Sequence, residues 1–154
     1  SFQLGSDYLS GDKRERTRFE AFNPLYGTHH KFYGAMDYFY ASPFANGLNP
    51  GLWDNYAGLN VAVTPSLSLG ATGHYFSTTS DLQSRTGSLS KGLGTEVDLQ
   101  LSWKLMKDVN LMAGYSFMSG TETMDYVKGG DHTRWQDWAW LSVNIQTRVF
   151  QAMW

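Results

Sequence analysis

The chain has 154 residues and no cysteine, which excludes disulfide frameworks and thiolate metal sites. It has no run of about 18 apolar residues, so no segment is suited to cross a membrane as a helix. Excess basic charge is also absent: the net charge is −2, and a nucleic-acid partner needs a concentrated basic surface. By length we expect one domain over residues 1–154. Because the start lacks a signal-peptide pattern, we expect either a mature chain or an excised piece.

The sequence also lacks the common motifs of catalysis and cofactor binding. There is no Gly-x-Ser-x-Gly elbow, no phosphate-binding glycine loop and no dinucleotide fingerprint. The adjacent His29 and His30 would point apart on a strand, and no His-x-x-x-His spacing occurs. We therefore expect no enzyme, no cofactor and no resident metal. A hard cation on the loop carboxylates Asp125 and Asp131 is the weaker alternative.

Alternation is the strongest pattern that is present, and it is clearest over Leu93–Met118. Odd positions in its two halves are almost all apolar or aromatic, whereas the even positions of the first half are mostly polar or charged. Because side chains on a strand alternate between faces, this predicts a hairpin with one apolar and one polar face. A three-residue loop, Met106–Asp108, keeps the parity, and the expected pairs are Leu105–Val109, Trp103–Leu111, Leu101–Ala113 and Leu99–Tyr115.

The same alternation recurs on both sides of Thr64–Ser66, near the C-terminus over Ala139–Ile145, and at Phe2, Leu4 and Tyr8. Six strands are therefore predicted. Two more, over Arg14–Phe22 and Phe32–Tyr40, would bring the number to eight. The short turns contrast with long connections at roughly Gly11–Asp54, Ser77–Gly92 and Ser119–Arg134.

The apolar face allows two interpretations. In a soluble sandwich or lipocalin-like barrel it would turn inward, and in a membrane barrel it would turn outward to lipid. Alternating runs of about 13 residues exceed the usual ~5–6 and reach the ~9–11 that a tilted strand needs to cross a bilayer. Loop asymmetry and aromatic residues near strand ends favour the membrane. The predicted fold is all-β, an antiparallel up-and-down meander forming a transmembrane β-barrel or its C-terminal part.

This interpretation assigns each strand residue to a face. Glu96 and Asp98, about 7 Å apart on one face, have the spacing of an inverting glycosidase pair, but ionised pore lining explains them better. The expected pore-lining residues are Asn60, His74, Glu96, Asp98, Gln100, Lys104, Asn110, Asn144 and Arg148. The expected lipid-facing residues are Leu59, Val61, Leu69, Val97, Leu99, Leu101, Trp103, Leu111, Tyr115, Leu141 and Val143.

A loop charge cluster, Arg14, Arg16 and Arg18, is open to two interpretations. At a pore mouth it would attract anionic solutes at low salt, and otherwise it is a solvated loop balanced by Glu15 and Glu20.

The run Phe22–Phe39 resembles the FNPLYPTNHKFYGxMDxF loop of alginate-export-type outer-membrane porins, with Gly27 where that motif has proline. Gly94–Leu99 and Ala113–Ser116 resemble the strand pair that follows it in that family. The resemblance implies a wide barrel of about eighteen strands in a Gram-negative outer membrane, passing anionic polysaccharide or other solutes. This chain would supply the C-terminal portion, with Phe150 or Trp154 as the terminal assembly signal.

Two functions follow as hypotheses. The first is a channel that passes solutes by diffusion through a polar lumen, with outer-membrane lipid or detergent as its surroundings. The second is a small soluble or self-associated β-barrel whose odd-numbered residues hold an apolar ligand. In either case a fragment with open strand edges is prone to self-association, because unpaired edges template pairing with other chains.

Overall fold

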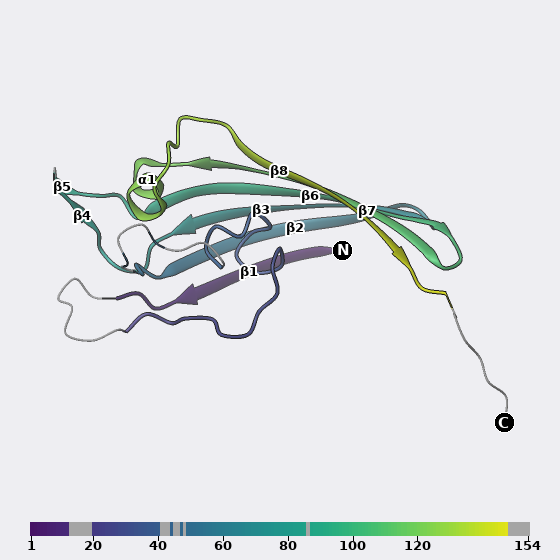
Figure 1. Ribbon diagram of the computed structural model, residues 1–154, viewed down its shortest axis with the longest axis horizontal. Coiled ribbons are helices and arrows are strands. Elements are labelled where there is room, and N and C mark those ends of the chain that lie inside the picture. Colours follow the sequence, from purple (N-terminus) through teal and green to yellow (C-terminus); the bar gives the residue numbers. More distant parts are fainter. Residues whose placement is uncertain (13–19, 41–43, 45–46, 48, 86, 148–154) are drawn as a thin grey trace, which may run out of the picture.

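The computed structural model describes residues 1–12, 20–40, 44, 47, 49–85 and 87–147. Six of its strands form one antiparallel sheet in chain order (Figure 1). The two-stranded hairpin β4 (Gln83–Ser84) and β5 (Gly87–Ser88) and the helix α1 (Glu122–Lys128) lie in the connections. The predicted all-β antiparallel meander is confirmed, and its strands are β1 (Phe2–Leu9), β2 (Leu52–Thr64), β3 (Leu67–Ser77), β6 (Gly92–Met106), β7 (Val109–Gly120) and β8 (Gln136–Ile145).

The two short turns are tighter than predicted. Thr64 pairs with Leu67 and Met106 pairs with Val109, so each turn has two residues and is preceded by a register shift. The predicted pair Leu105–Val109 is therefore wrong, because the bulge skips Leu105 and Met106 takes its place. The bulge restores the parity of a three-residue loop, and the other predicted pairs are confirmed: Trp103–Leu111, Leu101–Ala113 and Leu99–Tyr115.

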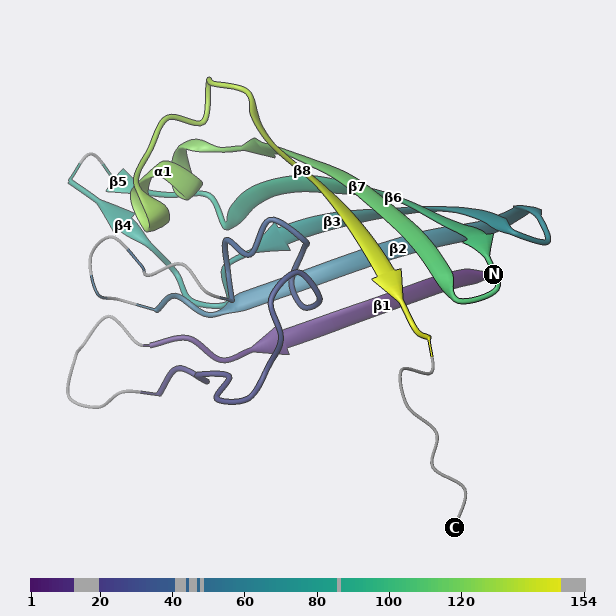
Figure 2. The same ribbon diagram turned by 45° about the vertical axis from the view of Figure 1, so that its right-hand side comes forward.

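The connections are strongly asymmetric between the two ends of the sheet. Both two-residue turns lie at one end, while α1 and the β4–β5 hairpin lie together at the other (Figures 1 and 2). The strand β6 is 15 residues long and β2 is 13, well above the usual ~5–6. Long strands with short turns at one end and long loops at the other were both predicted from the sequence, and both are observed.

A seventh strand over Phe32–Tyr40 is not formed. His30, Tyr33, Gly34 and Asp37 have φ values of 58°, 61°, 85° and 59°, so the chain doubles back there instead of extending. Residues 20–22 are also outside any strand, and the rest of the other candidate strand lies outside the described residues. In the part of the chain that the structure describes, β1 and β8 are the two edges of an open sheet.

The sheet has two unlike faces. Apart from Leu93, the odd-numbered residues of β2, β3, β6, β7 and β8 lie on the apolar face, together with the even-numbered residues of β1, because Phe2 pairs with Leu59. The polar face carries the remaining residues. Residues 29–40 of the long β1–β2 connection fold over the polar face, which curves around them (Figure 2).

The hydrophobic core is small and lies at the loop end of the polar side. It consists of Phe39, Leu52, Phe76, Leu82, Leu93, Met118, Met124 and Val127. The sequence alternation placed Leu93 in the apolar row, and this is wrong. A register shift beside Phe76 and Ser77 turns Leu93 inward, and Gly94 has φ 150° there, with Ser119 O 2.5 Å from where its Cβ would stand.

Candidate functional site

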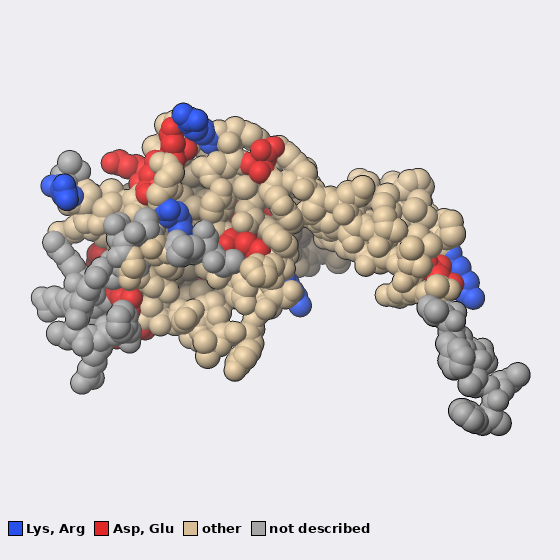
Figure 3. All heavy atoms as spheres, viewed as in Figure 1, with Lys and Arg blue, Asp and Glu red and all other residues tan. Residues whose placement is uncertain are grey.

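The apolar face is exposed, and no described element covers it. Leu59 is 54% exposed and Leu141 is 69% exposed. Strand pairing brings all the residues expected to face lipid onto this one side, with Leu59, Ala71, Leu99, Tyr115 and Ala139 forming one continuous row. Among the described strand residues of this face, Asp137 at the loop end is the only charged one. On the side seen in Figure 3, a band without charged residues separates the loop end from the turns.

Aromatic side chains bound this band. At the loop end Tyr8 contacts Trp53 edge to face with ring centroids 6.2 Å apart, and Phe117 stacks on Trp135 at 5.2 Å. Trp103 lies near the turn end, eight residues along β6 from Thr95, the pairing partner of Tyr75. Eight residues of strand span about 26 Å.

The polar face holds the residues expected to line a pore. His74 pairs with Glu96, Thr72 with Asp98, and Gly70 with Gln100. Lys104, Asn110 and Asn144 form one row near the turns. Asn60 completes the set from β2, opposite Gly70. Arg148 and the loop charge cluster Arg14, Arg16 and Arg18 lie outside the described residues.

Two carboxylates that the sequence reasoning missed join this face. Asp7 of β1 lies directly opposite Asp54 of β2. Asp54 is 0% exposed, and both of its oxygens lie 3.0 Å from His74 Nδ1, while His74 Nε2 lies 3.5 Å from Asp98 Oδ2. The signal was available for Asp54, because it shares even parity with Asn60 on the same strand. Asp7 follows from Asp54 only once the β1–β2 register is known.

The inserted loop is fixed to these carboxylates by backbone hydrogen bonds. Met36 N donates to Glu96 Oε1 at 2.9 Å, and Ala35 N donates to Asp98 Oδ2 at 3.3 Å. Gly34 lies so close to the Glu96 side chain that a Cβ added at residue 34 would stand 2.6 Å from Glu96 Oε2. Glycine is therefore required here both by the contact and by its φ of 85°. Glu96 is 0% exposed beneath the loop.

The same loop also reaches the far edge strand, β8. Tyr38 OH donates to Gln136 Oε1 at 2.6 Å, and the His30 ring stacks on Trp138 with centroids 4.2 Å apart. Burial and the nearby Glu96 raise the pKa of Tyr38, so its phenol stays protonated as a donor. These contacts tie residues 30–38 across the curved sheet.

Asp37 holds the turn of the loop together. Its Oδ1 accepts from His30 N at 2.8 Å, and its Oδ2 lies 3.0 Å from His29 Nδ1 and 3.1 Å from His30 Nδ1. On a strand His29 and His30 would point apart, but here they lie in a turn and both contact Asp37. Both imidazoles are used by a local structural contact.

A cavity of about 570 Å³ lies between the loop and the polar face. Strands β1, β2, β3 and β6 form its floor, and residues 30–35 form its cover. Its ionisable lining consists of Asp7, His30, Lys31, Asp54, His74 and Asp98, together with Tyr33 and Tyr56. Burial, followed by the charges of Asp7 and Asp54, raises the pKa of Tyr33.

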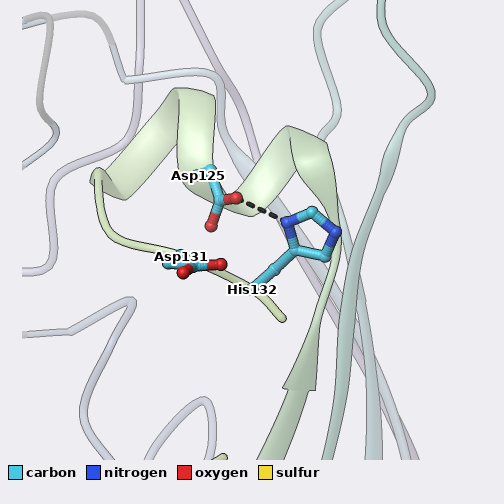
Figure 4. A group of neighbouring side chains, drawn as sticks. All are labelled: Asp125, Asp131 and His132. Carbon is cyan, nitrogen blue, oxygen red and sulfur yellow. Dashed lines mark hydrogen bonds and ion pairs between the residues drawn. The ribbon is translucent and has the colours of Figure 1, made fainter. Parts of the chain in front are cut away.

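A second group of ionisable residues consists of Asp125 on α1 and of Asp131 and His132 in the segment after it (Figure 4), with one ligand atom of each within 4.8 Å of the others. His132 Nδ1 is paired with Asp125 Oδ2, and this contact raises the pKa of His132. Asp131 accepts from Thr133 N at 3.0 Å and from Arg134 Nε at 3.2 Å. Both carboxylates that the sequence analysis considered as cation ligands, Asp125 and Asp131, therefore already accept hydrogen bonds from nearby residues.

Comparisons with protein-family profiles, with curated proteins and with solved structures give no match for this chain. Among the described residues, no helix has the length and apolar character needed to span a bilayer. The two faces of the sheet and the loop that covers one of them are therefore the features that bear on function.

Proposed function

We propose that this chain forms part of a porin, an outer-membrane channel through which solutes diffuse along a polar lumen. In this proposal the apolar face meets lipid and the polar face lines the lumen. One observation carries it: the sheet buries acidic side chains and exposes its apolar side chains. Asp54 and Glu96 are both 0% exposed, whereas Leu141 is 69% exposed.

This arrangement suits a membrane better than water. Apolar surface left in water costs about 25 cal/mol per Å², so a broad uncovered row of Leu and Val is unfavourable in a soluble monomer. In lipid the same row is stable, and the outward apolar band of outer-membrane barrels is about 25 Å tall. The strand distance from Thr95 to Trp103, about 26 Å before any tilt, is of that order.

Edge pairing supports a larger assembly. Backbone polar groups in a bilayer must be hydrogen-bonded, so the edges of β1 and β8, which are open among the described residues, need further strands. We propose that this chain is the C-terminal portion of a wider barrel in a Gram-negative outer membrane, as its resemblance to alginate-export porins implies. An anionic polysaccharide cargo would depend on Arg14, Arg16 and Arg18, which lie outside the described residues, and it stays a prediction.

The alternative is a soluble module whose odd-numbered residues enclose an apolar ligand. In the described sheet those residues lie on the outer side of the curve, and residues 29–40 fill the inner side. A closed apolar core would require the sheet to curl the opposite way. We therefore prefer the channel.

The proposal is tested by purification and by conductance. The chain is expected to aggregate or self-associate in water and to become monodisperse in detergent. The full-length natural protein, reconstituted in a planar bilayer, is expected to give discrete conductance steps. A chain that is monomeric in detergent-free buffer, or a correctly folded full-length protein without conductance, would contradict the proposal.

A further inference from the structure

We propose that the part of the lumen beneath residues 30–35 is selective for small cations, including amines, and that Asp7, Asp54 and Asp98 set this preference. This inference rests on the proposed channel function and names the solute class. It differs from the anionic cargo that the loop charge cluster suggests, and the charges that the structure does describe favour cations.

Strand pairing concentrates negative charge at this level of the lumen. Asp7 and Asp54 are direct cross-strand neighbours. Two like charges in this position normally destabilise the pairing of the strands. His74 lies between Asp54 and Asp98 and contacts both. Asp98 of β6 is the third carboxylate of the same cavity. Three carboxylates therefore line a cavity with one ammonium group, that of Lys31.

Compensating positive charge on the polar face lies far away. Among the described strand residues, Lys104 is the only lysine or arginine, and it is six residues along β6 from Asp98. This separation is about 20 Å at ~3.3 Å per residue, beyond the ~8 Å Debye length at physiological salt. A solute at the cavity therefore meets the field of the three carboxylates with little compensation from Lys104.

Glu96 has a different role from these three. Its Oε1 accepts the Met36 N–H, and its carboxylate lies directly beneath Gly34 and outside the cavity lining. We assign it to positioning the loop. Asp98, by contrast, lines the cavity, and its side chain is 18% exposed there.

The cavity lining also suits ammonium groups. The rings of Tyr33 and Tyr56 also line the cavity, and the centroid of the Phe32 ring already lies 5.4 Å from Lys31 Nζ. Aromatic faces attract cations through the ring quadrupole, and the low-dielectric walls of a narrow passage focus the field of fixed charges. A carboxylate beside aromatic rings favours an alkylammonium over a chloride or a carboxylate solute.

The test is the reversal potential of the full-length natural protein in a planar bilayer under a KCl gradient. We expect a K⁺ over Cl⁻ permeability ratio of at least threefold at 0.1 M salt, falling toward one at 1 M as screening shortens. The double variant Asp7→Asn with Asp98→Asn should lower the ratio at least twofold. Asp108→Asn in the β6–β7 turn is the matched control and should leave it unchanged.

A second variant protects against loss of the His74 contact. Gln100→Lys places an ammonium at the same cavity without removing any partner of His74, and it should lower the ratio in the same direction. Conductance with anion preference, or a ratio that neither variant changes, would overturn this inference and leave the channel intact. A folded protein without any conductance would overturn the proposed function itself, and the inference with it.

Discussion

Met36 donates its backbone N–H to the Glu96 carboxylate at 2.9 Å, across 60 residues of sequence. This bond and the neighbouring one from Ala35 to Asp98 hold the inserted loop against the polar face. A buried acid that would be costly in isolation is used here to accept backbone donors that would otherwise be unpaired.

Removing this acceptor should release the loop. Glu96→Ala is expected to cost about 1–3 kcal/mol, the typical cost of leaving a buried hydrogen-bond donor unsatisfied, and to expose residues 29–40 to protease. Glu96→Gln keeps the Oε1 acceptor and should retain most of the protection. Limited proteolysis of the detergent-solubilised protein measures both, and equal protection in all three proteins would argue against the anchor.

Gly34 should not tolerate a side chain. Gly34→Ala would place a Cβ 2.6 Å from Glu96 Oε2 at a φ of 85°, and the left-handed conformation alone costs about 1–2 kcal/mol. Gly73→Ala is the control, because nothing lies within 4 Å of its Cβ position. Thermal unfolding should separate the two variants, and an unchanged midpoint for Gly34→Ala would contradict the described loop geometry.

The His132–Asp125 contact should make the end of α1 sensitive to pH. The hydrogen bond that His132 donates to Asp125 raises the pKa of His132 above its ordinary 6.5. The stabilisation of the folded state by this contact is therefore complete below pH 6.5, and it is lost as the pH rises through the raised pKa of His132. An NMR titration of His132 checks this. Asp125→Asn should return the pKa toward 6.5, and a wild-type titration at or below that value would contradict the contact.

Tryptophans on the two faces should differ in their surroundings. Trp103 lies on the apolar face, and Trp140 lies on the polar face against Gly114. In vesicles containing brominated lipid, a variant retaining only Trp103 should be strongly quenched, and one retaining only Trp140 weakly quenched. Stronger quenching of Trp140 than of Trp103 would show that the two faces are assigned wrongly.

The faces of the sheet could be predicted from the sequence because strand alternation depends only on parity, and the two turns preserve it. Local departures were missed where one residue is skipped, as at Leu105, or turned inward beside a register shift, as at Leu93. Neither bulge leaves a signal in an alternating pattern.

The position of the loop could not be predicted. His30, Tyr33 and Asp37 adopt positive φ without being glycine, and this conformation is sustained by contacts with β6 and β8 far along the chain. The number of carboxylates that line the cavity was underestimated for the same reason. Asp7 and Asp54 join Asp98 only through strand register and His74.

The central claim is that the exposed apolar face meets lipid, and one matched pair of variants tests it most directly. Leu101 and Gln100 are neighbours on β6 that lie on opposite faces. In reversible unfolding from lipid vesicles, Leu101→Arg should cost about 2–4 kcal/mol at the bilayer midplane, and Gln100→Arg on the lumen side should cost little. Equal costs for the two arginines would contradict the membrane orientation.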